Sequence, residues 1–282
     1  MITPPYDHSL NLTTQAILTF ASWAIALGLL AASAWRGYRQ KTVFPVLLVL
    51  SAAVAALAEP LYDIGFKLLF FIPGQWTLFI YGDIPQPVWT VSGYTILYAG
   101  PAIFICEALA RGISRRTFLT WAAATLLASS VFEIYGIAGG AYTYWGAHAL
   151  RIFGYPLAVG VLETTFVLLF SVFAHEYRNR IANGWGLLGL FVLFPATFYG
   201  VNFGIGAPML VTLGLASPSP ALSIVSAAAS IGIAVGVLVA LAGYVAAPLS
   251  RTEEIGAPIA RAGCARALNA MGNNKAPLGR AS

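Results

Sequence analysis

Four acidic residues lie inside or at the edge of apolar runs: Glu59, Asp63, Glu133 and Glu163. A carboxylate at membrane depth costs about 2.5–3.5 kcal/mol on insertion scales, so it is usually paired or functional. Desolvation favours the neutral form of a carboxyl group, and a second carboxylate nearby favours it further. A neutral carboxyl donates a proton to a substrate, and an ionised neighbour takes one back. These four side chains are therefore our candidate catalytic groups.

Two of the four acids share the motif AEPLYDIG. Glu59 and Asp63 are four residues apart, so they share a face if the helix continues that far. Pro60 lacks a backbone donor and disfavours helix at the residue before it, so we expect the helix to kink or end there. Either outcome exposes carbonyl groups that a polar cavity satisfies. This motif is our best candidate for the core of the site.

Aromatic and polar side chains complete the candidate site. Aromatic faces stabilise cations, and hydroxyl and amide groups orient a substrate. The candidate substrate-binding residues are Tyr62, Tyr135, Tyr142, Tyr144, Trp145, Tyr199, Asn202 and Asp83. Each feature has a structural alternative: aromatic residues in loops anchor helices at the membrane interface, a loop aspartate is simply solvated, and buried acids form hydrogen bonds between helices.

Other kinds of chemistry have no support in the sequence. The three histidines, His8, His148 and His175, show no metal-ligand spacing, and there is no nucleophile triad or phosphate-binding loop. The two cysteines, Cys106 and Cys264, suggest neither a disulfide nor a redox pair. The last apolar run contains no lysine, which excludes a retinal Schiff base. We therefore expect no metal and no cofactor.

The composition of the chain is that of a membrane protein. Of its 282 residues, 59% are hydrophobic and 9% are charged, and the mean hydropathy is +0.80. Stretches of about 20 apolar residues predict membrane-spanning helices. Seven such stretches occur, at roughly 13–35, 43–63, 86–110, 117–138, 152–174, 186–210 and 220–247. We predict an all-α integral membrane bundle of about seven transmembrane helices.

The basic residues predict the orientation of this bundle. Thirteen of the fifteen lysines and arginines fall in alternate connections and in the C-terminal tail, and the other connections hold only Lys67 and Arg151. The positive-inside rule then places the N-terminus outside and the C-terminus in the cytoplasm of a multi-pass cell-membrane protein. The net charge of +5 is spread over short juxtamembrane clusters that suit anionic membrane lipid, so we expect no nucleic-acid partner.

Residues 1–250 are predicted to form one transmembrane domain, and residues 251–282 a disordered cytoplasmic tail. Two outer connections, 64–85 and 136–156, are rich in glycine, proline and aromatic residues and predict ordered turns or interfacial helices. Near the cytoplasmic end, Glu107 lies four residues before Arg111, which predicts an ordinary ion pair.

The depth of the acids follows from the predicted spans. Glu59, Asp63 and Glu133 fall in the outer third of their helices. A fifth helix that begins at about Ile152 leaves Glu163 roughly 16 Å down, near the midplane. One polar cavity that opens towards the outer side would collect all four side chains.

Several motifs support a family resemblance. The stretches EPLYD, GQW, YGDIPQPVW and GYTILYAG, followed by FEIYG, GAYTYWG and FGYPL, cover roughly residues 55–170. Together they resemble actinobacterial membrane proteins of the avermectin-type spirocyclase (AveC-like) family. The resemblance implies a membrane-embedded enzyme that closes rings in a polyketide and uses no dissociable cofactor.

Two further resemblances point to related chemistry. The stretch FEIYGIAGGAYTYWG, with the later LRIFGYPL, is similar to the acid, the Gly-Tyr-rich turn and the Gly-x-Pro-Leu of membrane carotenoid hydratases, which add water across an isoprenoid double bond by protonation. In architecture alone, the chain is similar to the seven-helix terpene cyclases of meroterpenoid pathways, which use intramembrane carboxylates. All three resemblances imply proton-driven chemistry on a lipophilic substrate.

We therefore expect a cofactor-independent cyclase that acts on a lipophilic polyketide or isoprenoid. In this hypothesis one carboxyl of the Glu59/Asp63 pair protonates the substrate, and Glu133 or Glu163 is the counter-base. A hydratase is the alternative within the same chemistry. A proton-coupled transporter and a lipid-binding membrane protein are alternatives of another class, although the repeated halves common in carriers are not visible here.

Overall fold

The computed structural model describes residues 3–181 and 184–246. The chain divides into two units, Met1–Val245 and Ala246–Ser282. The predicted tail, 251–282, lies outside the described residues. The fold below is that of the first unit.

Within the described residues, seven helical segments are long and apolar enough to cross a membrane. Several are built from more than one piece, with 3-10 turns (η1, η3) and π turns (η2, η4) between α-helices. In chain order the segments are α1 (Leu12–Gln40); α2 (Phe44–Ala55), η1 (Ala56–Ala58) and α3 (Glu59–Phe66); α4 (Trp89–Tyr94), η2 (Thr95–Ala99) and α5 (Gly100–Ala110); α6 (Arg115–Ala138); α7 (Leu157–Arg180); η3 (Gly186–Gly189), α8 (Leu190–Tyr199) and η4 (Gly200–Ile205); and α10 (Pro220–Val245).

These segments confirm the seven predicted apolar helices. Their bounds differ from the predicted ones by a few residues, and the first helix runs on to Gln40. Helix α7 begins at Leu157 rather than near Ile152, and the sixth segment ends at Ile205, after which α9 (Ala207–Gly214) forms a separate short helix.

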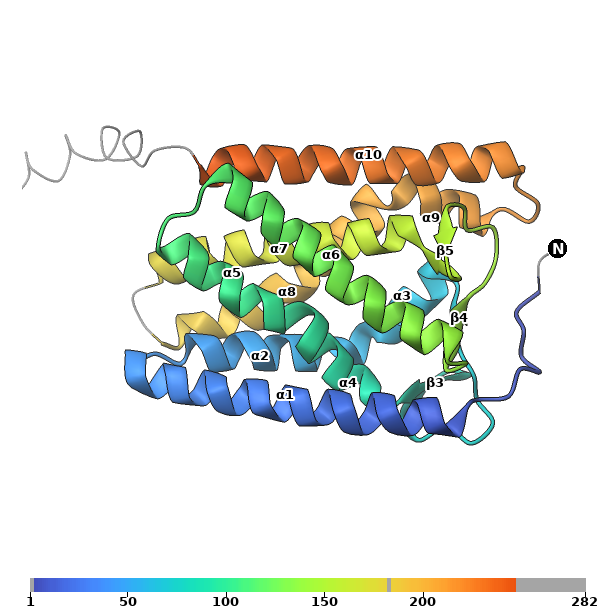
Figure 1. Ribbon diagram of the computed structural model, residues 1–282, viewed down its shortest axis with the longest axis horizontal. Coiled ribbons are helices and arrows are strands. Elements are labelled where there is room, and N and C mark those ends of the chain that lie inside the picture. The colour runs from blue at the N-terminus through green and yellow to red at the C-terminus, as the bar shows by residue number, and fades with distance from the viewer. Residues whose placement is uncertain (1–2, 182–183, 247–282) are drawn as a thin grey trace, which may run out of the picture. The chain divides into compact units, whose positions relative to one another are not determined.

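Helix α7 is the centre of the bundle (Figure 1). It packs against α5, α6, α8 and α10, and 83% of its most apolar window is buried. The corresponding most apolar windows of α1 and α10 are each only 28% buried. Exposed side chains on these two helices include Phe20, Trp35 and Val225. A helix whose exposed face is as apolar as its buried face is suited to contact with lipid. The fold is thus compatible with a membrane-spanning protein.

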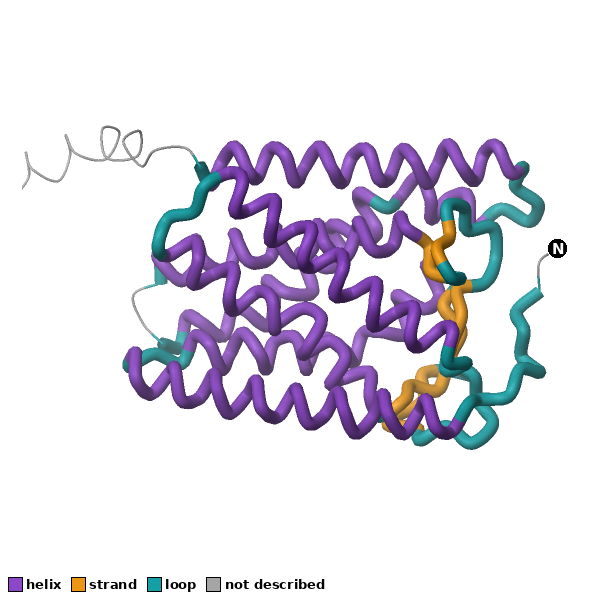
Figure 2. The backbone as a smooth tube through the Cα atoms, viewed as in Figure 1, coloured by secondary structure: helices purple, strands orange, loops and turns teal. Residues whose placement is uncertain are grey.

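Short strands gather at one end of the bundle, where the described N-terminal residues also lie (Figure 2). In the described chain they form three two-stranded antiparallel sheets. The pairs are β1 (Leu68–Phe70) with β4 (Tyr142–Tyr144), β2 (Thr77–Tyr81) with β3 (Ile84–Pro87), and β5 (Arg151–Ile152) with β6 (Tyr155–Pro156). Because the backbone groups of these connections pair across chain segments, they form no interfacial helices, contrary to that part of the sequence prediction.

The β1–β4 pair joins the ends of the second and fourth helical segments. Its register places Leu68 opposite Tyr144 and Phe70 opposite Tyr142. Side chains alternate across a strand, so both tyrosines of β4 are buried, whereas Thr143 between them is only partly buried. This pairing turns Tyr142 and Tyr144 into the bundle.

The second segment continues past its proline. A 3-10 turn precedes α3, and Pro60 lies in the first turn of α3, where its missing N–H costs no helical hydrogen bond. The Ala58 carbonyl, at the junction of η1 and α3, accepts a hydrogen bond from the Tyr199 hydroxyl at 2.9 Å. The predicted kink therefore takes the form of a local 3-10 turn, and both Glu59 and Asp63 remain in helix.

The predicted ion pair between Glu107 and Arg111 is wrong. Glu107 instead accepts from Arg36 of α1 at 2.8 Å. The Arg36 guanidinium also lies 5.2 Å from the centroid of the Phe104 ring, so packing between helices α1 and α5 selects the partner. The ends of α1, α5 and α7, where Arg36, Arg111 and Arg178 occur, lie at the end of the bundle opposite the strands (Figure 1). The orientation of the bundle across the membrane stays a prediction.

The close contact between α6 and β4 allows a prediction about the stability of the fold. A Cβ atom at Gly136 would lie 2.3 Å from the ring of Tyr142, which is buried. We expect Gly136→Ala to destabilise the fold by about 1–3 kcal/mol, the usual cost of overpacking. Gly232→Ala is the matched control, because nothing lies within 4 Å of its added Cβ. Thermal unfolding in detergent micelles measures both variants, and equal midpoints would contradict the β4 packing described above.

Candidate active site

Three of the four candidate acids meet around one cavity inside the bundle. Glu59 of α3, Glu133 of α6 and Glu163 of α7 are 6%, 7% and 3% exposed. The cavity has a volume of about 30 Å³, which is room for roughly one or two water molecules. Its lining also includes Tyr62, Leu68, Phe70, Trp89, Thr90, Gly93, Tyr94, Leu97, Tyr98, Phe132, Tyr142 and Tyr144. The walls are therefore mainly aromatic and aliphatic, with three carboxyl groups among them.

Glu163 accepts three hydrogen bonds from tyrosine hydroxyls. Its Oε1 accepts from Tyr98 at 3.0 Å and from Tyr62 at 3.3 Å, and its Oε2 accepts from Tyr155 at 3.1 Å. Helix α7 begins six residues earlier, so Glu163 lies about 9 Å from that helix end. This is shallower than the predicted midplane position and brings Glu163 level with the other two glutamates.

The other two glutamates also pair with tyrosines. Tyr94 donates to Glu59 Oε2 at 2.5 Å. Tyr144 donates to Glu133 Oε2 at 3.3 Å, and Tyr142 donates to the backbone oxygen of Glu133 at 3.4 Å. Six tyrosines from separate parts of the chain thus surround three carboxyl groups.

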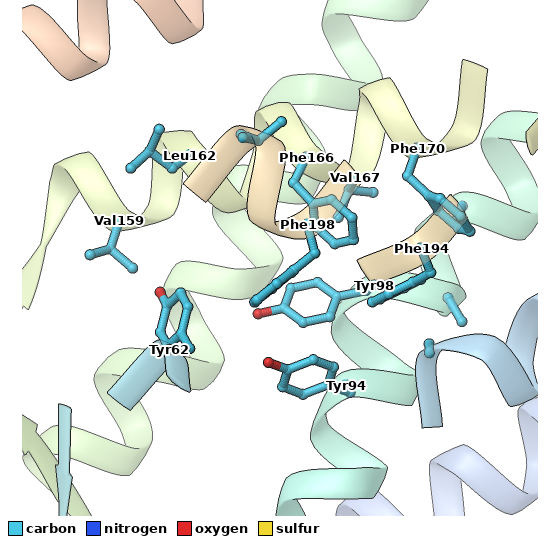
Figure 3. Packing of buried hydrophobic residues seen from close by; sticks show 14 of the residues in the cluster. Tyr62, Tyr94, Tyr98, Val159, Leu162, Phe166, Val167, Phe170, Phe194 and Phe198 are labelled. Atoms are coloured by element: carbon cyan, nitrogen blue, oxygen red, sulfur yellow. The ribbon is translucent and has the colours of Figure 1, made fainter. Parts of the chain in front are cut away.

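Two of these tyrosines come from one unusual stretch of helix. Tyr94 ends α4, and Tyr98 lies in the π turn η2 that follows; such turns are frequent at functional sites. Their rings meet edge to face, with centroids 4.9 Å apart. Figure 3 shows both hydroxyl groups pointing to the same side, with Phe194 and Phe198 packed beside the rings. The aromatic packing fixes where these two hydroxyl groups lie.

Within the described residues, the carboxyl cluster has no cationic partner. Among the residues that the structure describes, neither lysine nor arginine lines the cavity, and the two ion pairs are Arg36–Glu107 and Arg180–Glu176. Ionising three carboxyl groups together in a dry interior would be prohibitively costly. Neutral carboxyl groups that are hydrogen-bonded to tyrosine hydroxyls avoid that cost.

Asp63 lies one helical turn beyond Glu59 and lines a different pocket. This outer pocket has a volume of about 560 Å³, and Asp83, Lys67 and Trp145 also line it. Gln86 donates to Asp63 Oδ2 at 2.5 Å, while the buried Oδ1 has no partner within the described residues. Asp63 therefore lines the outer pocket while its side chain still interacts with Glu59, which lines the cavity.

A single strand divides the two spaces. Leu68 and Phe70 of β1 line both the cavity and the outer pocket. On the outer side, the Lys67 ammonium lies 4.6 Å from the centroid of the Trp145 ring. Trp145 and Asp83 thus belong to the outer pocket and not to the carboxyl cluster.

Three other predicted binding residues lie away from the cavity. Tyr135 is 41% exposed. The Tyr199 hydroxyl donates to the Ala58 carbonyl. Asn202 is fully buried; its Nδ2 donates to the Phe198 carbonyl at 3.0 Å, and its Oδ1 has no partner in the described chain. Tyr199 thus joins the sixth helical segment to the second, whereas the Asn202 hydrogen bond stays within its own segment.

Sequence reasoning missed four residues of the cluster and its surroundings: Tyr94, Tyr98, Tyr155 and Gln86. The first two are four residues apart in GYTILYAG, a spacing that places them on one helix face. That spacing was a usable signal, because two tyrosines on one face of an apolar span need hydroxyl partners. Tyr155 and Gln86 lie in loop-like sequence that carries no such signal.

The loop after β4 is held in place by His148 and Arg151. The His148 Nε2–H donates to the Phe66 carbonyl at 2.8 Å. Arg151 donates to the carbonyls of Tyr144 and Gly146 at 2.7 and 3.1 Å.

Tyr144 of β4 is held in its neutral form. Burial, and secondly the charge of Glu133, raise the pKa of Tyr144 well above its usual value. Its hydroxyl therefore keeps its proton at every physiological pH and acts as a hydrogen-bond donor.

Comparisons with known proteins add no assignment, because no family model, curated protein or solved structure matches this chain. Within the described residues, no group of three or more His, Cys, Asp or Glu side chains is arranged to hold a metal ion.

His148 makes the stability depend on pH. Burial lowers the pKa of His148 from 6.5 to about 4, so the unfolded chain binds a proton more readily than the folded chain between these values. The fold should lose up to roughly 3 kcal/mol as the pH falls from about 6.5 to about 4, and nothing further below. His148→Gln keeps a donor for the Phe66 carbonyl without titrating. Unfolding midpoints across this pH range should fall less steeply for the variant, and parallel profiles would contradict the buried, neutral His148.

Proposed function

We propose that this chain is a membrane-embedded acid–base enzyme, a cyclase that closes a ring in a lipophilic polyketide or isoprenoid. The observation that carries the proposal is the set of three buried carboxyl groups, each bonded to a tyrosine hydroxyl, around one cavity with aromatic walls. This arrangement offers a proton donor, a proton acceptor and surfaces for a cation. The localisation in the cell membrane belongs to the same proposal.

Each carboxyl suits a different step. Glu59 has one hydroxyl partner, so its proton is free to pass to a ketone, hydroxyl or alkene of the substrate. The cation that forms faces the rings of Trp89 and Tyr98. Where the protonated group is a hydroxyl, including that of a hemiketal, it leaves as water when the cation forms. A substrate hydroxyl or alkene then attacks the cation, and Glu163 takes the released proton. Three tyrosine donors solvate a carboxylate at Glu163, which favours it as the base. The proton returns to Glu59 within the tyrosine network, so no net proton is consumed.

Access to the cavity has to come from a neighbouring space. A volume of about 30 Å³ is far below the 300–1,000 Å³ usual for ligand sites, whereas the outer pocket has about 560 Å³. We place the entrance there, so that Leu68 and Phe70 move aside when a substrate enters. Asp63 and Trp145 would contact the substrate on its way in.

A hydratase is the second candidate, because the cavity has room for water beside the carboxyl groups. In that case water, rather than a group of the substrate, attacks the cation. The gathering of the three glutamates around one cavity favours a reaction pocket over a proton path between the two ends of the bundle, so we rank transport below both.

Product masses distinguish these reactions. The purified protein in lipid nanodiscs is incubated with two probes, a long-chain dihydroxyketone and a linear polyprenol, and extracts are analysed by liquid chromatography and mass spectrometry. Ring closure gives a spiroketal one water lighter than the first probe or an isomer of the second, and hydration gives a product one water heavier. Glu59→Gln and Glu163→Gln should each lower product formation by about 10²-fold or more, as expected for loss of a general acid or base.

Glu107→Gln is the matched control, because Glu107 forms its ion pair outside the site and should leave product formation unchanged. Undiminished product with both site variants would refute the proposed roles. If the wild-type protein converts neither probe but takes both up into proteoliposomes along a pH gradient, the transporter alternative holds instead.

A further inference from the structure

A second, separate pocket lies at the end of the bundle opposite the strands. It has a volume of about 970 Å³ and is formed by the end of α1, the start of α2, the end of α7 and the turn before α8. The described residues that line it are Ala34, Gly37, Tyr38, Arg39, Lys41, Thr42, Val43, Val46, Arg178, Ile181, Gly184 and Leu187. None of them takes part in the carboxyl cluster.

The charge of this pocket is wholly positive. Arg39, Lys41 and Arg178 line it, and its described lining contains no aspartate or glutamate. The neighbouring Arg36 and Arg180 are neutralised by Glu107 and Glu176, but the three lining cations have no carboxylate within 4 Å among the described residues. An anion is the partner that this arrangement lacks.

The fold holds the cations in position. Lys41 caps α1 in the left-handed conformation, and the Thr42 N–H donates to the Gly37 carbonyl at 2.9 Å. A Cβ atom at Gly37 would lie 2.6 Å from the Thr42 oxygen, so glycine permits this close turn. The Arg178 guanidinium lies 4.9 Å from the centroid of the Phe44 ring at the start of α2. The pocket is therefore built by the α1–α2 turn and by the packing of α7 on α2.

An apolar wall continues from the cations along the bundle. Val43, Val46, Ile181 and Leu187 contribute to the same pocket. Inorganic phosphate would use only the cations, and a zwitterionic headgroup would bring its own positive charge against them. A molecule with a phosphate and an acyl chain uses both parts. We propose that this pocket binds an anionic phospholipid of the adjoining leaflet, with its phosphate between Arg39, Lys41 and Arg178 and an acyl chain on the apolar wall.

Lipid-dependent stability tests this site. The unfolding midpoint of the full chain in detergent micelles is measured with added phosphatidylglycerol, with phosphatidylcholine of the same acyl chains, and with inorganic phosphate alone. Phosphatidylglycerol should raise the midpoint most. Native mass spectrometry measures bound lipid in a titration. Lys41→Gln should weaken the binding of phosphatidylglycerol about fivefold, since each basic residue near an anionic surface contributes a factor of about that size to binding. The triple change Arg39→Gln, Lys41→Gln, Arg178→Gln should abolish the preference.

The triple change Arg111→Gln, Arg115→Gln, Arg116→Gln is the matched control. It removes the same charge from another basic connection that does not line this pocket, so the preference for phosphatidylglycerol should persist. An equal loss of the preference for phosphatidylglycerol in both triple variants would show a general attraction to basic surfaces and would overturn the proposed lipid site. An equal response to phosphatidylcholine would overturn the choice of an anionic lipid, and an equal response to inorganic phosphate would overturn the choice of a lipid. The single variant Lys41→Gln keeps the test valid if the triple variant does not fold.

Discussion

The structure depends on keeping three glutamates inside an apolar bundle without a cation. Water is scarce there, so their oxygens need donors from the protein itself. Tyrosine hydroxyls meet that need and arrive from α3, α4, η2, β4 and β6. Each tyrosine also packs its ring in the core. The same contacts therefore hold the bundle together and define the site.

The strands at one end of the bundle serve this arrangement. The β1–β4 register buries Tyr142 and Tyr144, and His148 and Arg151 tie the following loop to α3 and β4. The same strand β1 separates the carboxyl cavity from the outer pocket. Small sheets that would add little stability alone thus set both the shape of the cavity and its proposed entrance.

Hydropathy alone predicted the seven apolar helices, because about 20 apolar residues in a row leave few other structures open. The gathering of Glu59, Glu133 and Glu163 at one end of the bundle agrees with the predicted outer cavity, although α7 begins later than predicted and moves Glu163 closer to that end. Depth does not give rotation about a helix axis, so the sequence could not show that Asp63, one turn from Glu59, also lines a second pocket. The strands were not predicted, because β1 and β4 pair across more than 70 residues of sequence. A local sequence pattern cannot indicate a contact of that kind.

The central claim is that the three glutamates form one cluster that holds protons in the membrane interior. Infrared spectroscopy of the carboxyl carbonyl stretch at neutral pH, on the wild-type protein and on Glu59→Gln, Glu133→Gln and Glu163→Gln, tests it most directly. The account predicts bands of protonated carboxylic acids that Glu59→Gln and Glu133→Gln remove or shift, whereas Glu163→Gln, which replaces the ionised base, shifts the bands of its partners. A spectrum without such bands, or single substitutions that leave them unchanged, would contradict it.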